Sequence, residues 1–196
     1  PVAEPVAEPE PEPVTVAVSE PIQEPELVVV AEPEPIPIPK LVFIVPYRDR
    51  MEQYKFFSKH MKWILEDMNK QDYRILYIHQ KDNRDFNRGS MKNIGFIIVR
   101  KLYPNDYKNI TLVFNDIDNM PLSPNFVNYH TTKNNVKHFY GFKFALGGIV
   151  SINAEDFEKI NGFPNFWGWG YEDNLLQKRV LEANMEIDRN QFYPIY

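Results

Sequence analysis

Three short apolar segments alternate with two amphipathic segments early in the chain, and this alternation restricts the possible folds more than any other feature. Residues 41–46, 74–79 and 110–114 are rich in β-branched and aromatic side chains, which predicts buried strands. Residues 51–70 and 90–101 repeat apolar side chains at helical spacing, which predicts helices. This order implies parallel strands joined by right-handed crossovers. We therefore expect an α/β fold with a mostly parallel, Rossmann-like sheet flanked by helices.

Both expected helices carry apolar residues at helical spacing. In the second helix, the expected apolar face consists of Ile94, Ile97, Ile98 and Leu102. In the first helix, the apolar residues at helical spacing are Phe56, Phe57, Met61, Ile64, Leu65 and Met68.

The later part of the chain has a weaker pattern. Gly147 and Gly148 lie between apolar residues within 142–152, which indicates a close backbone approach at a strand. A short helix is expected from residue 153 to 160, with Asn153 as its N-cap. Another is expected over 172–183, where acidic residues at the start suit the helix dipole.

Residues 1–40 differ in composition from the rest of the chain. They contain 11 of the 17 prolines and nine Glu against one Lys, which gives a charge of −8. Because the whole chain carries −5, residues 41–196 carry +3, which is too small to argue for nucleic-acid binding. Proline and mutually repelling glutamates favour an extended spacer. We expect a linker or stem over 1–40 and one domain over 41–196.

The chain contains no cysteine. This excludes disulfides, thiol chemistry and zinc–cysteine sites, and it favours a reducing compartment such as the cytoplasm. No apolar run approaches the length of a membrane span, and no signal peptide is recognisable. The chain begins with Pro, so we expect a piece of a longer protein, with any upstream anchor outside this sequence.

Two carboxylates follow the third expected strand, in the order Asp116, Ile117, Asp118. Ligands of parallel sheets bind at the carboxyl ends of the strands. Carboxylate oxygens there suit Mg²⁺ or Mn²⁺, which also hold diphosphate oxygens. The alternative is an ordinary pair of loop-capping aspartates. The four histidines show no metal-ligand spacing, and we expect packed or surface roles for them.

Basic residues follow the first expected strand. Arg48 and Arg50 are suited to holding phosphate, and the sheet topology predicts that they share one cleft with Asp116 and Asp118. The alternative is a solvated turn in which they pair with neighbouring acidic residues.

A second candidate for nucleotide binding precedes the second helix. Phe86 and Arg88 could hold a nucleobase and its phosphates. The alternative is that Asn87 caps the helix while Phe86 packs in an ordinary way.

Aromatic residues and glycines alternate in residues 162–173, just before two carboxylates. Trp167 and Trp169 offer the flat faces that sugar rings bind, and Glu172 and Asp173 follow at the start of a helix. A carboxylate beside an apolar wall can act as a general base on a hydroxyl. The alternative is an aromatic turn packed in the core, with the two acids only capping the helix.

Taken together, these motifs resemble one family. The sequence is similar to the β-1,4-galactosyltransferases and the related β-1,4-N-acetylgalactosaminyltransferases over nearly all of residues 41–190. The matching blocks occur in the family's order, and the last is the most specific. They are 43–50 (FIVPYRDR), 86–88 (FNR), 93–96 (NIGF), 113–118 (VFNDID), 147–148 (GG) and 160–173 (INGFPNFWGWGYED).

The resemblance implies a nucleotide-diphosphosugar transferase fold of the GT-A type, Mn²⁺ (with Mg²⁺ as a substitute), a UDP-sugar donor, a glycan acceptor and the Golgi lumen. It implies that Asp173 is the catalytic base beside Glu172, and that Asp118 binds the metal. The residues implied to bind the nucleotide-sugar are Pro46, Tyr47, Arg48, Arg50, Phe86, Arg88, Asp116, Ile117, Gly148 and Trp169.

The sequence departs from the family at several places. The family places a Met and a His metal ligand shortly beyond the region matching Arg189, so we expect either a truncated chain or an incomplete metal site. Ala145 stands where animal members carry an aromatic residue, which makes UDP-GalNAc as plausible a donor as UDP-Gal. Tyr171 and Asn174 replace a small and an acidic residue near the acceptor, and the family's disulfides are absent.

Three functions are therefore expected in order of preference. The first is an inverting transferase of galactose or N-acetylgalactosamine to a sugar hydroxyl. The second is a non-catalytic module that binds a glycan or a nucleotide. The third is a polymer-forming domain of the chondroitin type.

Overall fold

The computed structural model describes residues 37–195. The expected linker over 1–40 lies almost wholly outside the described residues, so it stays a prediction. Within them, regular structure begins at Leu41, and Lys40 forms an ion pair of 2.8 Å with Asp72.

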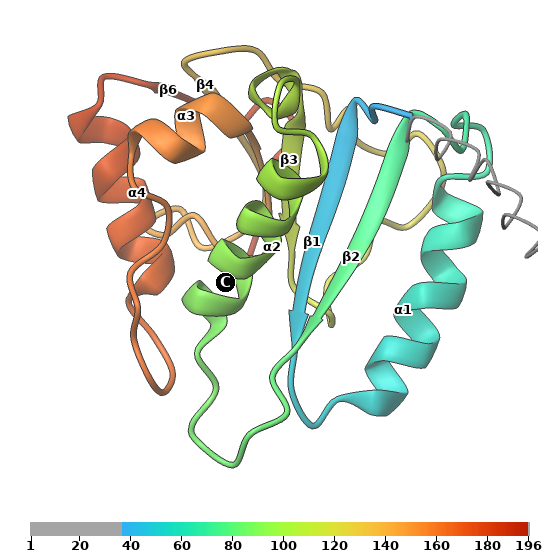
Figure 1. Ribbon diagram of the computed structural model, residues 1–196, viewed down its shortest axis with the longest axis horizontal. Helices are drawn as coiled ribbons and strands as arrows, with labels where there is room; N and C mark the ends of the chain where they lie inside the picture. The colour runs from blue at the N-terminus through green and yellow to red at the C-terminus, as the bar shows by residue number, and fades with distance from the viewer. Residues whose placement is uncertain (1–36, 196) are drawn as a thin grey trace, which may run out of the picture. The chain divides into compact units, whose positions relative to one another are not determined.

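The first part of the domain has the predicted alternation of strands and helices (Figure 1). Strand β1 pairs in parallel with β2 on one side and with β3 on the other, as predicted. The elements are β1 (Leu41–Tyr47), α1 (Met51–Ile64), β2 (Tyr73–His79), α2 (Arg88–Leu102), the 3-10 turn η1 (Tyr107–Asn109) and β3 (Thr111–Asn115).

The second part completes a mixed sheet of order β2-β1-β3-β5-β4-β6. Strand β5 runs antiparallel to both β3 and β4, while β4 pairs in parallel with β6 and β7. Parallel pairing still predominates, and the antiparallel part arises because a short loop, rather than a helix, joins β4 to β5. The elements are β4 (Asn135–Gly141), β5 (Ile149–Asn153), α3 (Ala154–Lys159), α4 (Glu172–Glu182), β6 (Glu186–Asp188) and β7 (Tyr193–Pro194).

The sheet separates two apolar cores. Successive residues of β1 point to opposite faces, so Val42 and Ile44 join the core under α2, α3 and α4. Leu41 and Phe43 join the core under α1. Every residue of β1 is buried, as expected for a central parallel strand covered on both faces.

Two details of the helices differ from the sequence-based expectation. Helix α1 ends at Ile64, because the chain turns after Leu65. In α2 half of the predicted apolar face is wrong, since Ile94 and Ile97 are 40% and 41% exposed, whereas Ile98 and Leu102 are half-buried against the core. The buried face of α2 instead consists of Gly89, Lys92, Gly95, Phe96 and Val99.

A glycine explains this rotation of α2. A Cβ atom on Gly95 would lie 2.4 Å from Cγ2 of Ile44 in β1, closer than carbon atoms can approach. The helix therefore packs against the sheet through Gly95, and its Ile94 and Ile97 side chains turn outward. The same rotation directs Lys92 toward the interior, where it meets the candidate site.

Two further local predictions are confirmed. Asn153 caps α3 by accepting a hydrogen bond of 3.1 Å from the backbone N–H of Glu155. Gly148 has a φ of +70°, and a Cβ atom there would lie 2.3 Å from the carbonyl oxygen of Tyr140 in β4, which is the predicted close approach.

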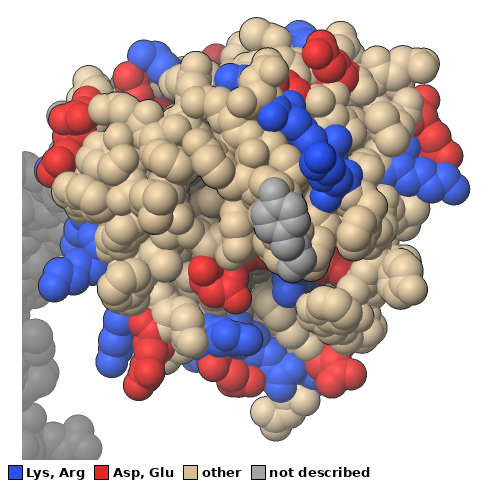
Figure 2. Space-filling model, turned by 180° about the vertical axis from the view of Figure 1, so that it is seen from behind, with Lys and Arg blue, Asp and Glu red and all other residues tan. Residues whose placement is uncertain are grey.

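On the face seen in Figure 2, basic and acidic side chains are interspersed among uncharged ones. None of the helices within residues 37–195 has both the length and the apolar character to cross a bilayer.

Candidate active site

Five charged side chains meet where α2 and α4 begin and β3 ends. Arg88 and Lys92 come from α2, Asp116 follows β3, and Glu172 and Asp173 open α4. Nη1 of Arg88 lies 3.4 Å from Asp116, 3.4 Å from Glu172 and 3.8 Å from Asp173. Nζ of Lys92 lies 3.2 Å from Asp173 and 3.5 Å from Asp116. Two cations thus share a largely buried space with three carboxylates.

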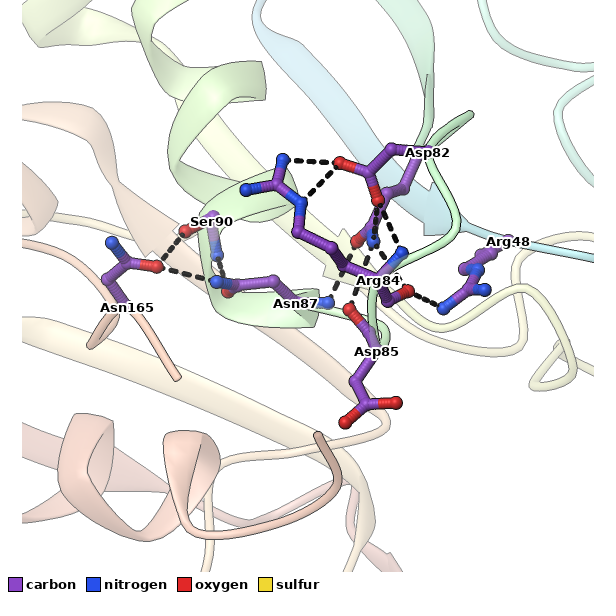
Figure 3. A network of polar contacts seen from close by, with 8 residues as sticks. Arg48, Asp82, Arg84, Asp85, Asn87, Ser90 and Asn165 are labelled. Carbon is purple, nitrogen blue, oxygen red and sulfur yellow. Dashed lines mark hydrogen bonds and ion pairs between the residues drawn. The ribbon is translucent and has the colours of Figure 1, made fainter. Parts of the chain in front are cut away.

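The start of α2 is fixed by Asn87. Its side chain accepts a hydrogen bond of 2.9 Å from the backbone N–H of Ser90, so Asn87 is an N-cap. Its backbone N–H donates to the side chain of Gln80 at 2.8 Å. Asn165 accepts hydrogen bonds from Asn87 and Ser90, which joins the β2–α2 loop to the aromatic segment (Figure 3). Capping at Asn87 was one of the two sequence-based alternatives, and it orients Arg88 on the first turn.

The end of β3 is fixed by the paired glycines. The backbone N–H of Asp116 donates to the carbonyl of Gly148 at 2.9 Å. The backbone N–H of Leu146 donates to the carbonyl of Asp173 at 3.1 Å. The short loop between β4 and β5 therefore holds Asp116 on one side and the first turn of α4 on the other.

The chain enters α4 through an irregular, exposed segment. Gly168, Gly170 and Tyr171 all have positive φ, and Tyr171 does so without the freedom of glycine. Trp169 is 89% exposed and Tyr171 is 77% exposed, so this segment is not an aromatic turn packed in the core. Trp167 is covered on one side by the guanidinium of Arg84, 4.0 Å from the ring centroid.

Burial and charge shift the ionisation of the site. The pKa of Asp173 is raised to about 6, chiefly by burial and also by the charges of Asp116 and Glu172, while Lys92 and Arg88 oppose the rise. For Lys92, burial lowers the pKa, but the carboxylates of Asp116 and Asp173 outweigh it, and the net pKa is raised. The ammonium therefore stays charged, and Asp173 changes its charge close to neutral pH.

A cavity of about 390 Å³ opens beside these charges. Its wall combines aromatic rings with charged groups, the mixture that a nucleotide-sugar requires. It is lined by Asp85, Phe86, Arg88, Gly168, Trp169 and Glu172. Phe86 is half-buried against this cavity.

Comparison with known proteins identifies the family. A model described as the N-terminal region of glycosyl transferase group 7 matches residues 26–131. A second model, described as the N-terminal domain of galactosyltransferase, matches residues 128–196. The chain belongs to the group 7 galactosyltransferase family.

Individual relatives agree with this assignment. The chain is 35% identical over 158 residues to the xylosylprotein 4-beta-galactosyltransferase of Caenorhabditis elegans, covering 76% of this chain and 53% of the relative. It is 32% identical over 160 residues to mouse beta-1,4-galactosyltransferase 1, covering 76% of this chain and 38% of the relative. The chain thus spans about half the length, or less, of these curated relatives.

Solved structures confirm the GT-A type of fold. The catalytic domain of Drosophila beta-1,4-galactosyltransferase 7, solved with xylobiose, superposes with a TM-score of 0.65 at 28% identity, covering 76% of this chain and 64% of that one. A mutant of the same enzyme, solved with manganese, UDP-Gal and xylobiose, matches equally well. A mannosyltransferase from Pyrobaculum calidifontis, at 11% identity and a TM-score of 0.54, shares the fold, covering 83% of this chain and 58% of that one.

The arginines after β1 do not contact the carboxylates after β3. The side chain of Arg48 lies 3.1 Å from Asp49 and donates to the carbonyl of Arg84 (Figure 3), and Arg50 is exposed at the start of α1. The ion-pair partners of Asp116 are instead Arg88 and Lys92 of α2, and a cleft shared by Arg48, Arg50, Asp116 and Asp118 stays a prediction. Pro46 and Tyr47 end β1, and nucleotide binding by residues 46–50 stays a prediction.

Asp118 is the residue that the sequence predicts to bind a metal ion. Asp118 is exposed and lines a mainly apolar cavity of about 320 Å³, while the neighbouring Ile117 is buried. Within residues 37–195, no three His, Asp or Glu side chains are grouped as a metal ion would require. Metal binding by Asp118 stays a prediction.

His138 is a packed histidine, as expected. It is fully buried, its Nδ1 accepts from Nε of Arg189 at 3.2 Å, and its Nε2 lies 3.1 Å from the carbonyls of Tyr140 and Gly147. Burial, followed by the charge of Arg189, lowers its pKa to about 4. The neutral ring thus braces the β4–β5 loop that holds Asp173.

Lys92 is the site residue that the sequence-based reasoning missed. It lies four residues after Arg88, so the two side chains share one face of α2, and this spacing was the available signal. The signal was obscured because the apolar residues of α2 predicted a different buried face.

Proposed function

We propose that this protein is an inverting glycosyltransferase that moves galactose, or N-acetylgalactosamine, from a UDP-sugar to a sugar hydroxyl. The observation that carries the proposal is the Asp173 carboxyl at the start of α4. Its side chain is 15% exposed, its pKa is raised to about 6, and Glu172, next to it in the chain, lines the 390 Å³ cavity. A base of this kind is mostly ionised at neutral pH and is still basic enough to accept a proton.

The proposed step is a single displacement. An acceptor hydroxyl gives its proton to Asp173 while its oxygen forms a bond to the anomeric carbon of the donor sugar. The bond from that carbon to the diphosphate oxygen breaks, and UDP leaves with the electron pair. Attack from the face opposite the leaving group inverts the anomeric carbon, and Arg88, within 4 Å of Asp173, supplies positive charge near the reacting groups.

The donor is proposed to lie in the cavity that Phe86, Arg88, Trp169 and Glu172 line. Family membership and the UDP-Gal bound in the Drosophila neighbour favour galactose. Ala145 is small and buried beside the paired glycines, which keeps N-acetylgalactosamine as a second donor to test.

Manganese is proposed as the metal, because the Drosophila neighbour was solved with it. When bound, a divalent cation neutralises charge on a leaving diphosphate, and Asp118 would be one of its ligands. Magnesium is the substitute to test.

The acceptor is proposed to be a glycan, with xylosides tested first because of the Caenorhabditis elegans relative and the xylobiose complexes. Tyr171 and Asn174 lie within two residues of Asp173 in the sequence and are expected to shape this side of the site. The Golgi lumen is proposed as the compartment because membership of the galactosyltransferase family suggests it. The cytoplasm, which the lack of cysteine favoured, is not supported.

The proposal is tested by measuring UDP release from purified full-length protein with Mn²⁺ or Mg²⁺, UDP-Gal or UDP-GalNAc, and a panel of xyloside and other glycoside acceptors. Turnover should fall roughly 10²- to 10⁴-fold in Asp173→Asn. The matched control is Glu182→Gln, an exposed carboxylate at the other end of α4, which should keep full turnover.

Two results contradict the proposal. One is the absence of turnover with every donor and acceptor, and the other is unchanged turnover in Asp173→Asn. UDP binding by calorimetry that is indifferent to metal and occurs without turnover supports the non-catalytic module instead. A ladder of long products supports a polymer-forming enzyme.

A further inference from the structure

Lys92 is a fully buried ammonium group at the junction of three segments of the site. The residue is 1% exposed on the second turn of α2. Its Nζ contacts Asp173 at the start of α4 and Asp116 at the end of β3. It also lies 4.7 Å from the ring centroid of Phe163, in the segment that leads toward the tryptophans.

Burying a lysine in this way is costly unless its charge is matched. An isolated ammonium in the protein interior loses several kcal/mol of hydration, so buried lysines are rare unless they are paired. Here the two carboxylates come from different elements that are far apart in the sequence. The ammonium group of Lys92 in α2 therefore links the end of β3 to the start of α4.

The backbone around Lys92 keeps this group inside. Cβ atoms on Gly89 and Gly95 would lie 2.4 Å from the carbonyl oxygen of Pro164 and from Cγ2 of Ile44, respectively. Both glycines thus allow α2 to approach its neighbours closely enough to enclose the lysine.

We propose that Lys92 is a positioning residue for the reaction, which holds the Asp173 carboxylate toward Asp116 and supplies the main positive charge that faces it. This inference rests on the proposed function, in which Asp173 is the base. The other charged groups that face Asp173 are Arg88 from α2, Asp116 after β3 and Glu172 in α4. Removing the lysine charge leaves one cation against three carboxylates.

Two consequences follow from this charge balance. The Asp173 carboxyl should take up its proton at higher pH, because an opposite charge within about 4 Å shifts an Asp pKa by about one to three units. The carboxylate should also lose one of the contacts that fixes its direction. A lysine that only filled space would produce neither effect when replaced by a side chain of similar length.

The test compares three variants of the full chain. Lys92→Met removes the charge and keeps the length, and Lys92→Arg keeps the charge. Lys101→Met removes an exposed lysine from the same helix and is the matched control. The titration midpoint of the Asp173 carboxyl carbon is followed by NMR, with Asp173→Asn used to assign the signal, and the pH dependence of kcat is measured alongside.

We expect the midpoint to start near 6 in the wild type and to rise by about one unit or more in Lys92→Met. It should rise less in Lys92→Arg and not at all in Lys101→Met, and the acidic limb of the kcat profile should move with it. An unchanged midpoint in a folded Lys92→Met protein overturns the inference.

A second measurement needs no substitution at Lys92 and applies if Lys92→Met does not fold. In the wild type, the Nζ resonance of Lys92 should shift with the same midpoint as the Asp173 carboxyl, and this inflection should vanish in Asp173→Asn. An Nζ resonance without that inflection overturns the inference. Both NMR readouts are independent of turnover. A wild type that binds no donor would therefore contradict the proposed function, while the NMR titrations would still test the pairing of Lys92 with Asp173.

Discussion

Gly147 leaves the space that the Asp173 carboxylate occupies. A Cβ atom at Gly147 would lie 2.5 Å from Oδ2 of Asp173 and 3.1 Å from its Cγ, whereas the backbone of Gly147 does not need a positive φ. The glycine is therefore required by the neighbouring carboxylate rather than by its own backbone conformation.

Gly147→Ala should therefore displace Asp173 without straining the β4–β5 loop. We expect turnover to fall by on the order of 100-fold, because a shift of about 1 Å in a reacting group has effects of that size. Steady-state kinetics and the thermal midpoint are measured together. Lys143→Ala, at an exposed position of the same loop, is the control and should retain activity. Full activity in Gly147→Ala contradicts the packing described here.

The ionisation of Asp173 predicts how stability depends on pH. Its folded-state pKa of about 6 lies above its ordinary value of 3.8, so the native state binds this proton more tightly than the unfolded state. The stability that this group contributes is present at low pH and is lost as the pH rises through about 6. Relative to Asp173→Asn, the wild type should lose roughly 1–3 kcal/mol of unfolding free energy between about pH 4 and pH 7. Urea unfolding across that range measures the difference, and a constant gap between the two proteins contradicts it.

Because Trp169 is exposed, we expect it to contribute to ligand binding and little to the stability of the fold. With 89% of the residue exposed, Trp169→Ala should change the free energy of unfolding by less than about 0.5 kcal/mol. Because Trp169 lines the 390 Å³ cavity, the same variant should weaken donor binding severalfold, measured as Kd by calorimetry with the UDP-sugar. Unchanged affinity would remove Trp169 from the proposed site.

The close packing of α2 against β1 predicts a stability effect at Gly95. Gly95→Ala places a methyl group against Ile44, and we expect a loss of about 1–3 kcal/mol from overpacking, despite the better helix propensity of alanine. Ile94→Ala, on the exposed face of the same helix, should cost less than about 1 kcal/mol, which chemical denaturation can resolve. The reverse order of the two effects would support the helix face that the sequence predicted.

The sequence by itself determined the features that depend on local pattern. The alternation of strands and helices, the cap at Asn153, the close approach at Gly148 and the blocks shared with the family all follow from neighbouring residues. Parallel pairing of β1 with β2 and β3 followed as well, because the crossover rule leaves few alternatives.

Tertiary packing decided the rest. Contact between Gly95 and Ile44 selected the buried face of α2, and this turned Lys92 toward Asp116 and Asp173. It thereby placed two positive charges of α2, Arg88 and Lys92, beside these carboxylates. The periodicity of α2 indicated one apolar face, and the close approach of Gly95 to the sheet decided which residues are buried. Gly95 and Ile44 are about fifty positions apart in the sequence, so no local sequence pattern could indicate this close approach.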